Sequence, residues 1–118
     1  FNSSDPRVQA VLDKFEETYG EQMDTEAMLA YQAIYVIADA LERAASSDPA
    51  DVRAALAETN IVDHFLAYPG PITFDATGEN VNAQPTLMQV QDGKVLQVAP
   101  EAIGETDPVF PGTSWGGN

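Results

Sequence analysis

The sequence contains no cysteine. Disulfides and thiolate metal sites are therefore excluded, while oxidising and reducing compartments both remain open. Histidine is nearly absent as well: His64 stands alone between Asp63 and Phe65, with no further ligands at the spacing of a zinc site. We predict no metal site, and nothing in the sequence suggests a cofactor.

Basic side chains are scarce. The chain has 5 lysines and arginines against 19 acidic residues, which gives a formal net charge of -14. A charge of this sign repels phosphate backbones and anionic lipid surfaces, so we expect no nucleic acid or anionic membrane partner. The carboxylates predict a solvated surface; an acidic face that recruits a cationic partner is the alternative.

Motifs of catalysis are lacking too. The sequence has no nucleophile elbow, phosphate-binding loop or cysteine nucleophile, so we do not expect an enzyme. The acidic and polar residues from Asp75 to Asn80 do not have the spacing of an EF-hand loop, which favours a capped turn over a calcium site. The stretch after Phe1 shows neither the basic region nor the apolar run of a signal peptide, and we expect no transmembrane segment.

What the chain does have is one long run of helix formers, Thr25 to Ala45. A helix of this length reaches roughly 30 Å, the width of a small domain. Between Ala27 and Ala38 the one polar side chain is Gln32, so apolar groups surround the axis and more than one face must be covered. Four small residues would allow a close approach of a neighbouring backbone: Ala27, Ala30, Ala33 and Ala38. We predict a core helix that lies flat on a sheet.

Two further helices flank this central one. The first runs from Pro6 to Tyr19, with Asp5 as its N-cap and Gly20 as the left-handed residue that ends it. The central helix takes Asp24 or Thr25 as its cap, and the third runs from Pro49 to Thr59 after the cap Asp48.

After the third helix the hydrophobic residues no longer recur at the spacing of a helix. Ile61 to Pro71 reads as a loop, and Ile72 to Phe74 as a short strand. From Leu87 to Val98, two β-rich runs flank Asp92-Gly93, a pair suited to a two-residue hairpin turn. In that register Val90 faces Val95 and Gln89 faces Leu96, so the hairpin should be partly covered on each side.

The tail after Pro100 is rich in proline and glycine. We expect it to run over a surface without secondary structure of its own. Phe110 and Trp115 are its candidate anchors.

The predicted strands are too few to cover the predicted helices. Three helices, one of them apolar all round, have only a short strand and one hairpin to cover them, whereas helices of this kind normally pack on a sheet. Either a partner copy supplies the missing strands, or this is the C-terminal part of a larger α/β protein.

The order of these elements and their sequence motifs resemble those of a known protein family. The motifs are FEETYG, AYQAIYVIADALERA, DPADVRAALAET, GPITFDATGEN and LMQVQDGKVLQVAP. Their succession resembles the C-terminal third of the type I periplasmic solute-binding proteins, in the branched-chain amino acid class that serves ABC transporters. The resemblance implies an α/β fold in which two lobes close over a small solute.

By this resemblance, residues 1–82 would be a helical part of the N-terminal lobe. Residues 83–85 would form a hinge crossing, and 86–118 would give the hairpin and tail of the C-terminal lobe. The implied function is extracytoplasmic delivery of a small solute, an amino acid or a related compound, to an ABC permease. A ligand-sensing or interaction module on the same fold is the alternative.

In that family the residues that enter the central helix line the ligand cleft, often with an aromatic. Here Thr25 and Glu26 take that place. A helix N-terminus favours a negative ligand group, whereas Glu26 would suit an amino group or a cationic solute. The alternative is that Glu26 only complements the helix dipole.

Overall fold

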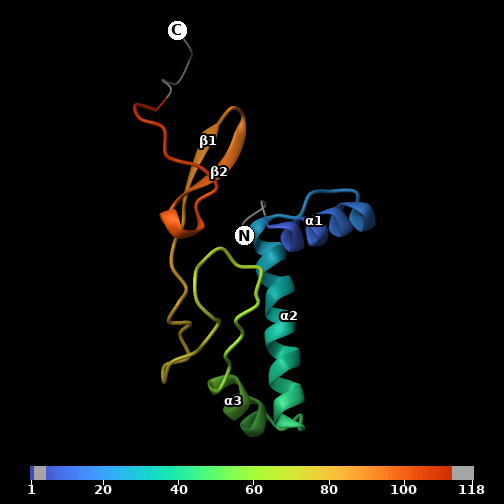
Figure 1. The fold of residues 1–118 in the computed structure, drawn as a ribbon. Helices are drawn as coiled ribbons and strands as arrows, with labels where there is room; N and C mark the ends of the chain where they lie inside the picture. The colour runs from blue at the N-terminus through green and yellow to red at the C-terminus, as the bar shows by residue number, and fades with distance from the viewer. Residues whose placement is uncertain (2–4, 113–118) are drawn as a thin grey trace. The chain divides into compact units, whose positions relative to one another are not determined.

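The computed structural model describes residues 1 and 5–112. They belong to two compact units, Phe1–Gln84 and Pro85–Asn118, here called the helical unit and the hairpin unit. The helical unit contains α1 (Pro6–Tyr19), α2 (Thr25–Ala44) and α3 (Pro49–Ala57) (Figure 1). The hairpin unit contains β1 (Leu87–Gln91), β2 (Lys94–Ala99) and the 3-10 helix η1 (Glu101–Ile103). The three predicted helices and the predicted hairpin are confirmed.

Aspartates begin all three helices. The carboxylates of Asp5, Asp24 and Asp48 accept hydrogen bonds of 2.8 Å from backbone N–H groups in the first turn. α1 ends where Gly20 takes a φ of 74°. α2 ends at Ala44 because Ala45 turns left-handed, and α3 ends at Ala57, earlier than the predicted Thr59.

α1 lies across the N-terminal end of α2, and α3 packs at the C-terminal end of α2 (Figure 1). Ala40 and Ala55 are buried, and Arg43 reaches across to donate to the carbonyl of Ala55 at 2.6 Å. The Asp39 carboxylate, 2.6 Å from the Arg43 guanidinium, raises the pKa of Arg43. Ala33 and Ala38 are exposed instead, so no backbone among the described residues uses the close approach they would allow.

Gln32, the one polar residue between Ala27 and Ala38 of α2, faces inward. Gln32 is 2% exposed, and its side-chain oxygen accepts a hydrogen bond of 2.9 Å from the N–H of Phe65. Large apolar side chains of α2 face outward instead: Leu29, Ile34, Tyr35, Ile37 and Leu41. The predicted coverage of several faces is therefore not supplied by the described residues.

The loop that meets Gln32 is fixed by its own bonds. His64 Nε2 donates to the carbonyl of Gly70 at 2.8 Å, and Nδ1 accepts from the N–H of Leu66 at 3.2 Å. The prediction of a strand at residues 72–74 is wrong, although two of these residues do pair with other backbone segments. Ile72 and Phe74 make only isolated bridges, to Ile61 and Asn80, since no neighbouring strand in the described range extends the ladder.

The polar residues after Phe74 form the predicted capped turn. The Asp75 carboxylate accepts from the N–H and hydroxyl of Thr77 at 2.8 and 2.6 Å, and from the N–H of Glu79 at 3.1 Å. These bonds, led by that from the Thr77 hydroxyl, lower the pKa of Asp75.

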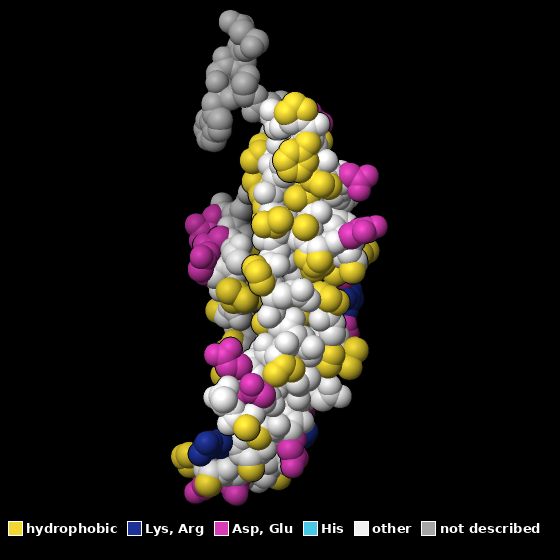
Figure 2. Space-filling model, turned by 90° about the vertical axis from the view of Figure 1, so that its left-hand side faces the viewer, with side chains coloured by type: hydrophobic (Ala, Val, Ile, Leu, Met, Phe, Trp, Pro, Cys, Tyr) yellow, Lys and Arg dark blue, Asp and Glu magenta, His cyan; other side chains and the backbone are white. Residues whose placement is uncertain are grey.

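The hairpin has the predicted register, with Val90 opposite Val95 and Gln89 opposite Leu96. Its turn places Asp92 and Gly93 at φ of 50° and 77°, the positive values that a two-residue loop of this type demands. Val90 and Val95 are exposed, and Figure 2 shows hydrophobic side chains at the surface of this unit.

The tail folds back along the hairpin. Gln89 pairs with the backbone of Val109 through both ends of its amide, at 2.9 and 3.0 Å, and Gln91 donates to the carbonyl of Asp107 at 2.9 Å. Two expectations for the tail are wrong. The tail has secondary structure of its own, the 3-10 helix η1. Phe110 does not anchor it, since its side chain is 85% exposed and the amides of Gln89 and Gln91 hold the segment instead. Trp115 lies outside the described residues.

We expect Gln32→Leu to lower the free energy of unfolding by about 1–3 kcal/mol, because the part-buried N–H of Phe65 loses its acceptor. Urea denaturation followed by circular dichroism measures this change. Gln22→Leu, the same substitution at an exposed position, is the matched control. Equal urea midpoints for the two variants would contradict the role of Gln32.

Candidate functional site

The predicted site residues lie in the first turn of α2. Thr25 and Glu26 directly follow the cap Asp24, and both are exposed. The Asp24 carboxylate accepts a hydrogen bond from the N–H of Ala27. The N–H groups that precede it, at the start of the helix, have no backbone acceptor inside the helix. The turn therefore presents free backbone donors beside the carboxylates of Asp24 and Glu26.

An apolar cluster holds this end of α2 in place. Val8 of α1, Met23 of the connection and Met28 of α2 are buried against one another, with Met28 only 1% exposed. The partly buried side chains around them are Phe1, Val11, Leu12, Phe15, Ala27, Tyr31 and Phe65. The first turn of α2 is thus anchored by α1 and by the loop after α3, which keeps Thr25 and Glu26 in a fixed position.

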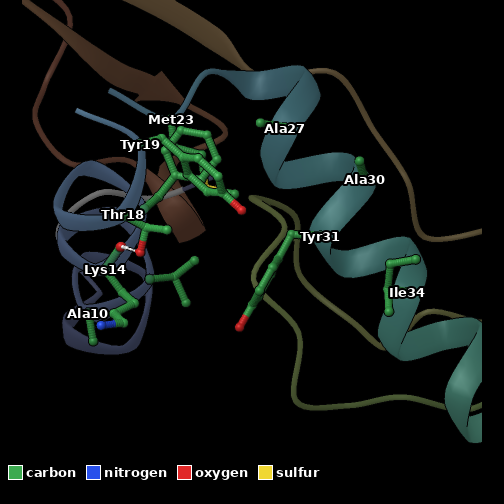
Figure 3. A pocket seen from close by; sticks show the side chains of 11 residues that line it. Ala10, Lys14, Thr18, Tyr19, Met23, Ala27, Ala30, Tyr31 and Ile34 are labelled. Atoms are coloured by element: carbon green, nitrogen blue, oxygen red, sulfur yellow. Dashed lines mark hydrogen bonds between the residues drawn. The ribbon is translucent and has the colours of Figure 1, made fainter. Parts of the chain in front are cut away.

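A hollow of 730 Å³ lies between α1 and α2. Figure 3 shows side chains of α1, among them Lys14 and Tyr19, facing Tyr31 of α2 across it (Figure 3). The lining is almost wholly apolar, and neither Thr25 nor Glu26 belongs to it. The structure therefore does not bring the predicted site residues into this hollow, and their contact with a ligand stays a prediction.

Three aromatic rings gather at the edge of the hollow. The ring of Tyr31 lies 5.1 Å from that of Tyr35 and 5.7 Å from that of Phe65, between ring centroids. The two phenol oxygens are 3.0 Å apart. This hydrogen bond, assisted by burial, raises the pKa of Tyr31. Sequence reasoning did not assign these rings to a site: the i, i+4 spacing of the tyrosines was visible, but nothing local pointed to Phe65.

No group of three or more potential metal ligands occurs in the part of the chain that the structure describes. Both ring nitrogens of His64 are already engaged with the backbone of its own loop. None of the helices within the described ranges combines the length and apolar character needed to cross a membrane.

We expect Tyr35→Phe to lower the pKa of Tyr31 toward its ordinary value of 10.0, because the hydrogen bond to Tyr35 is the main cause of the rise. A raised pKa means that this interaction stabilises the fold below pH 10.0 and is lost as the pH rises through the pKa of folded Tyr31. NMR titration of isotopically labelled tyrosine follows Tyr31 directly. Tyr19→Phe is the control, and an unchanged Tyr31 midpoint in Tyr35→Phe would contradict the assignment.

Residues 1–94 match the family described as periplasmic binding protein. The chain is 30% identical over 107 residues to "Leu/Ile/Val-binding protein homolog 7" of Brucella suis biovar 1 (strain 1330), and 31% identical over 107 residues to the protein of that name from Brucella abortus (strain 2308). Each match covers 90% of this chain but 27% of the relative, so the chain spans about a quarter of the length of these relatives. The resemblance to type I periplasmic solute-binding proteins of the branched-chain amino acid class is confirmed, and the chain belongs to the periplasmic binding protein family.

Proposed function

We propose that these residues are part of an extracytoplasmic solute-binding protein that delivers an amino acid or a related compound to an ABC importer, without catalysis. The observation that carries the proposal is the family match over residues 1–94. The names of the relatives, which refer to leucine, isoleucine and valine, support an amino acid as the solute class. The partners would be the solute and the ABC permease, and the location periplasmic or extracytoplasmic.

Within this proposal the two units belong to different lobes. Residues 1–82 would be the helical part of the N-terminal lobe, 83–85 a hinge crossing, and 86–118 the last elements of the C-terminal lobe. In support, the chain divides into compact units between Gln84 and Pro85, inside the proposed crossing. A hinge crossing needs few contacts of its own, since it must bend when the lobes close.

Thr25 and Glu26 are the proposed ligand contacts. A free amino acid carries a carboxylate and an ammonium group, and the first turn of α2 offers a partner for each. Its unpaired backbone N–H groups suit the carboxylate, while the exposed side chain of Glu26 suits the ammonium group. The proximity of both kinds of group in one turn favours a zwitterion over a simple anion, which the carboxylates of Asp24 and Glu26 would repel.

The 118-residue chain alone should not bind amino acids with useful affinity, because a cleft between two lobes draws its contacts from both and the chain spans about a quarter of its relatives. Isothermal titration calorimetry against leucine, isoleucine, valine, glutamate and arginine checks this expectation. Micromolar binding by the isolated chain would show that a complete site exists here and would overturn the two-lobe assignment.

Glu26 can be tested in a hybrid in which this chain replaces the matching residues of the Brucella suis relative. We expect Glu26→Gln to weaken amino acid binding by about 10- to 100-fold, since a hydrogen bond to a charged group contributes about 1.5–3 kcal/mol. Glu21→Gln, an exposed glutamate outside the first turn, is the matched control. If both variants bind as tightly as the parent hybrid, Glu26 serves only the helix dipole.

A further inference from the structure

The chain is fastened to the helical unit immediately before the proposed hinge crossing. The side-chain amide of Asn80 donates to the hydroxyl of Tyr68 at 2.6 Å. The amide of Asn82 donates to the carbonyl of Pro71 at 2.7 Å. Between them, the backbone N–H of Val81 donates to the same segment, to the carbonyl of residue 73, at 3.3 Å. Residues 80–82 are therefore held against residues 68–73 by three hydrogen bonds in succession.

The turn that receives Asn82 is itself fixed. The carbonyl of Gly70 accepts from His64 Nε2 at 2.8 Å, and the ring of His64 lies 4.7 Å from that of Tyr68, between ring centroids. Gly70 has a φ of 90°, and a Cβ added to it would lie 3.1 Å from Cγ of Asn82. A glycine suits both conditions, since it tolerates positive φ and has no side chain. The side chain of Asn82 thus packs directly against the backbone of this turn.

The loop that contains this turn is attached to α2. The side chain of Gln32 accepts from the N–H of Phe65 at 2.9 Å. Ile61 and Ile72 exchange two backbone hydrogen bonds, of 3.1 and 2.8 Å. Asn82 is therefore connected to the same body as α2, whose first turn carries the proposed ligand contacts.

These attachments end where the proposed crossing begins. The N–H of Ala83 donates back to the carbonyl of Asn80 at 3.1 Å. Gln84 and Pro85 are exposed and make no hydrogen bond to the described residues. Regular pairing resumes only with β1, which begins at Leu87. The backbone between Asn82 and β1 can therefore change its angles without breaking contacts of its own.

We propose that Asn82 is a positioning residue for lobe closure: its amide fastens the chain to Pro71, so that the bend between the lobes begins after Asn82. The inference rests on the proposed function, in which residues 83–85 cross from one lobe to the other. A hinge bends at a few residues that absorb the change in backbone angles. A fixed starting point restricts the directions in which the second lobe can move. Closure then brings the ligand contacts of the two lobes together in one geometry.

The partners of the two asparagines differ in a way that a test can use. A carbonyl oxygen only accepts, so Asn82→Asp leaves Pro71 without a donor. The hydroxyl of Tyr68 can also donate, and burial raises the pKa of Tyr68, so the hydroxyl keeps its proton at neutral pH. Asn80→Asp therefore keeps its hydrogen bond with the roles reversed. The two substitutions add the same charge two residues apart, but only Asn82→Asp removes a bond.

The first measurement asks whether the bond holds the segment. In the 118-residue chain we expect Asn82→Asp to speed the amide hydrogen exchange of Val81, relative to its intrinsic rate, by about 2- to 10-fold, the effect of losing one hydrogen bond. NMR follows this amide directly. Asn80→Asp should leave the exchange unchanged, as should Asn60→Asp, which adds the same charge at an exposed position. Equal exchange of Val81 in the Asn82 and Asn60 variants would overturn the proposal.

The second measurement asks whether the bond directs the lobes. In the Brucella suis hybrid, with any other cysteine replaced, dyes on Glu16→Cys in α1 and Lys94→Cys in β2 report the distance between the units by single-molecule fluorescence transfer. We expect Asn82→Asp to broaden the distribution of distances in the ligand-free hybrid. Leucine binding should weaken by about 2- to 10-fold, because the closed state is then less populated. Asn80→Asp should reproduce the parent hybrid in both respects.

Two results in the hybrid would overturn the proposal. If the distribution stays as narrow in Asn82→Asp as in the parent, Asn82 only stabilises its own loop, even where the thermal midpoint falls. Equal broadening by Asn80→Asp assigns the effect to the added charge. Asn82→Ala, which removes the amide without adding a charge, takes the place of Asn82→Asp if that variant does not fold. A parent hybrid that binds no amino acid contradicts the proposed function, whereas the distances between the dyes still decide the role of Asn82.

Discussion

The helical unit depends on the hydrogen bond between Gln32 and the N–H of Phe65. Gln32 is the one polar side chain between Ala27 and Ala38, and it points inward, where its amide oxygen accepts a hydrogen bond from a part-buried loop N–H. Leaving such an N–H unpaired costs up to about 1–3 kcal/mol, which favours the rotation of α2 that turns Gln32 inward. When Gln32 points inward, the apolar side chains on the other side of the helix, among them Ile34 and Ile37, point outward.

In the hairpin unit too, side-chain amides make the internal hydrogen bonds while apolar side chains stay exposed. Gln89 and Gln91 bind the backbone of the tail, while Val90 and Val95 on the opposite face stay exposed. Gln97 is fully buried, and its side-chain nitrogen and oxygen have no partner among the described residues. In both units, polar amides are enclosed and apolar faces remain open. This is the reverse of the arrangement expected of a self-sufficient small domain, and it agrees with a chain that spans about a quarter of its relatives.

This arrangement also bears on the proposed site. The first turn of α2 is held by Val8, Met23 and Met28, so its position relative to α1 does not depend on the exposed apolar side chains farther along the helix. A rigid first turn is what a binding site needs, because a preorganised contact avoids the entropy of ordering it when the ligand arrives. The proposed ligand contacts and the exposed apolar side chains can therefore coexist on one helix.

The sequence by itself determined the features that rest on neighbouring residues. The aspartate caps, the glycine after α1, the hairpin register and the Asp75 turn all depend on contacts a few residues apart, and all were predictable. The position of Thr25 and Glu26 in a first turn was predictable for the same reason, although their ligand contact stays a prediction. Only the tertiary structure decided that Gln32 would be buried, that Phe65 would join Tyr31 and Tyr35, and that residues 72–74 would remain isolated bridges. These outcomes depend on residues far apart in the chain, and an all-round apolar helix has no periodicity that says which of its sides will be covered first.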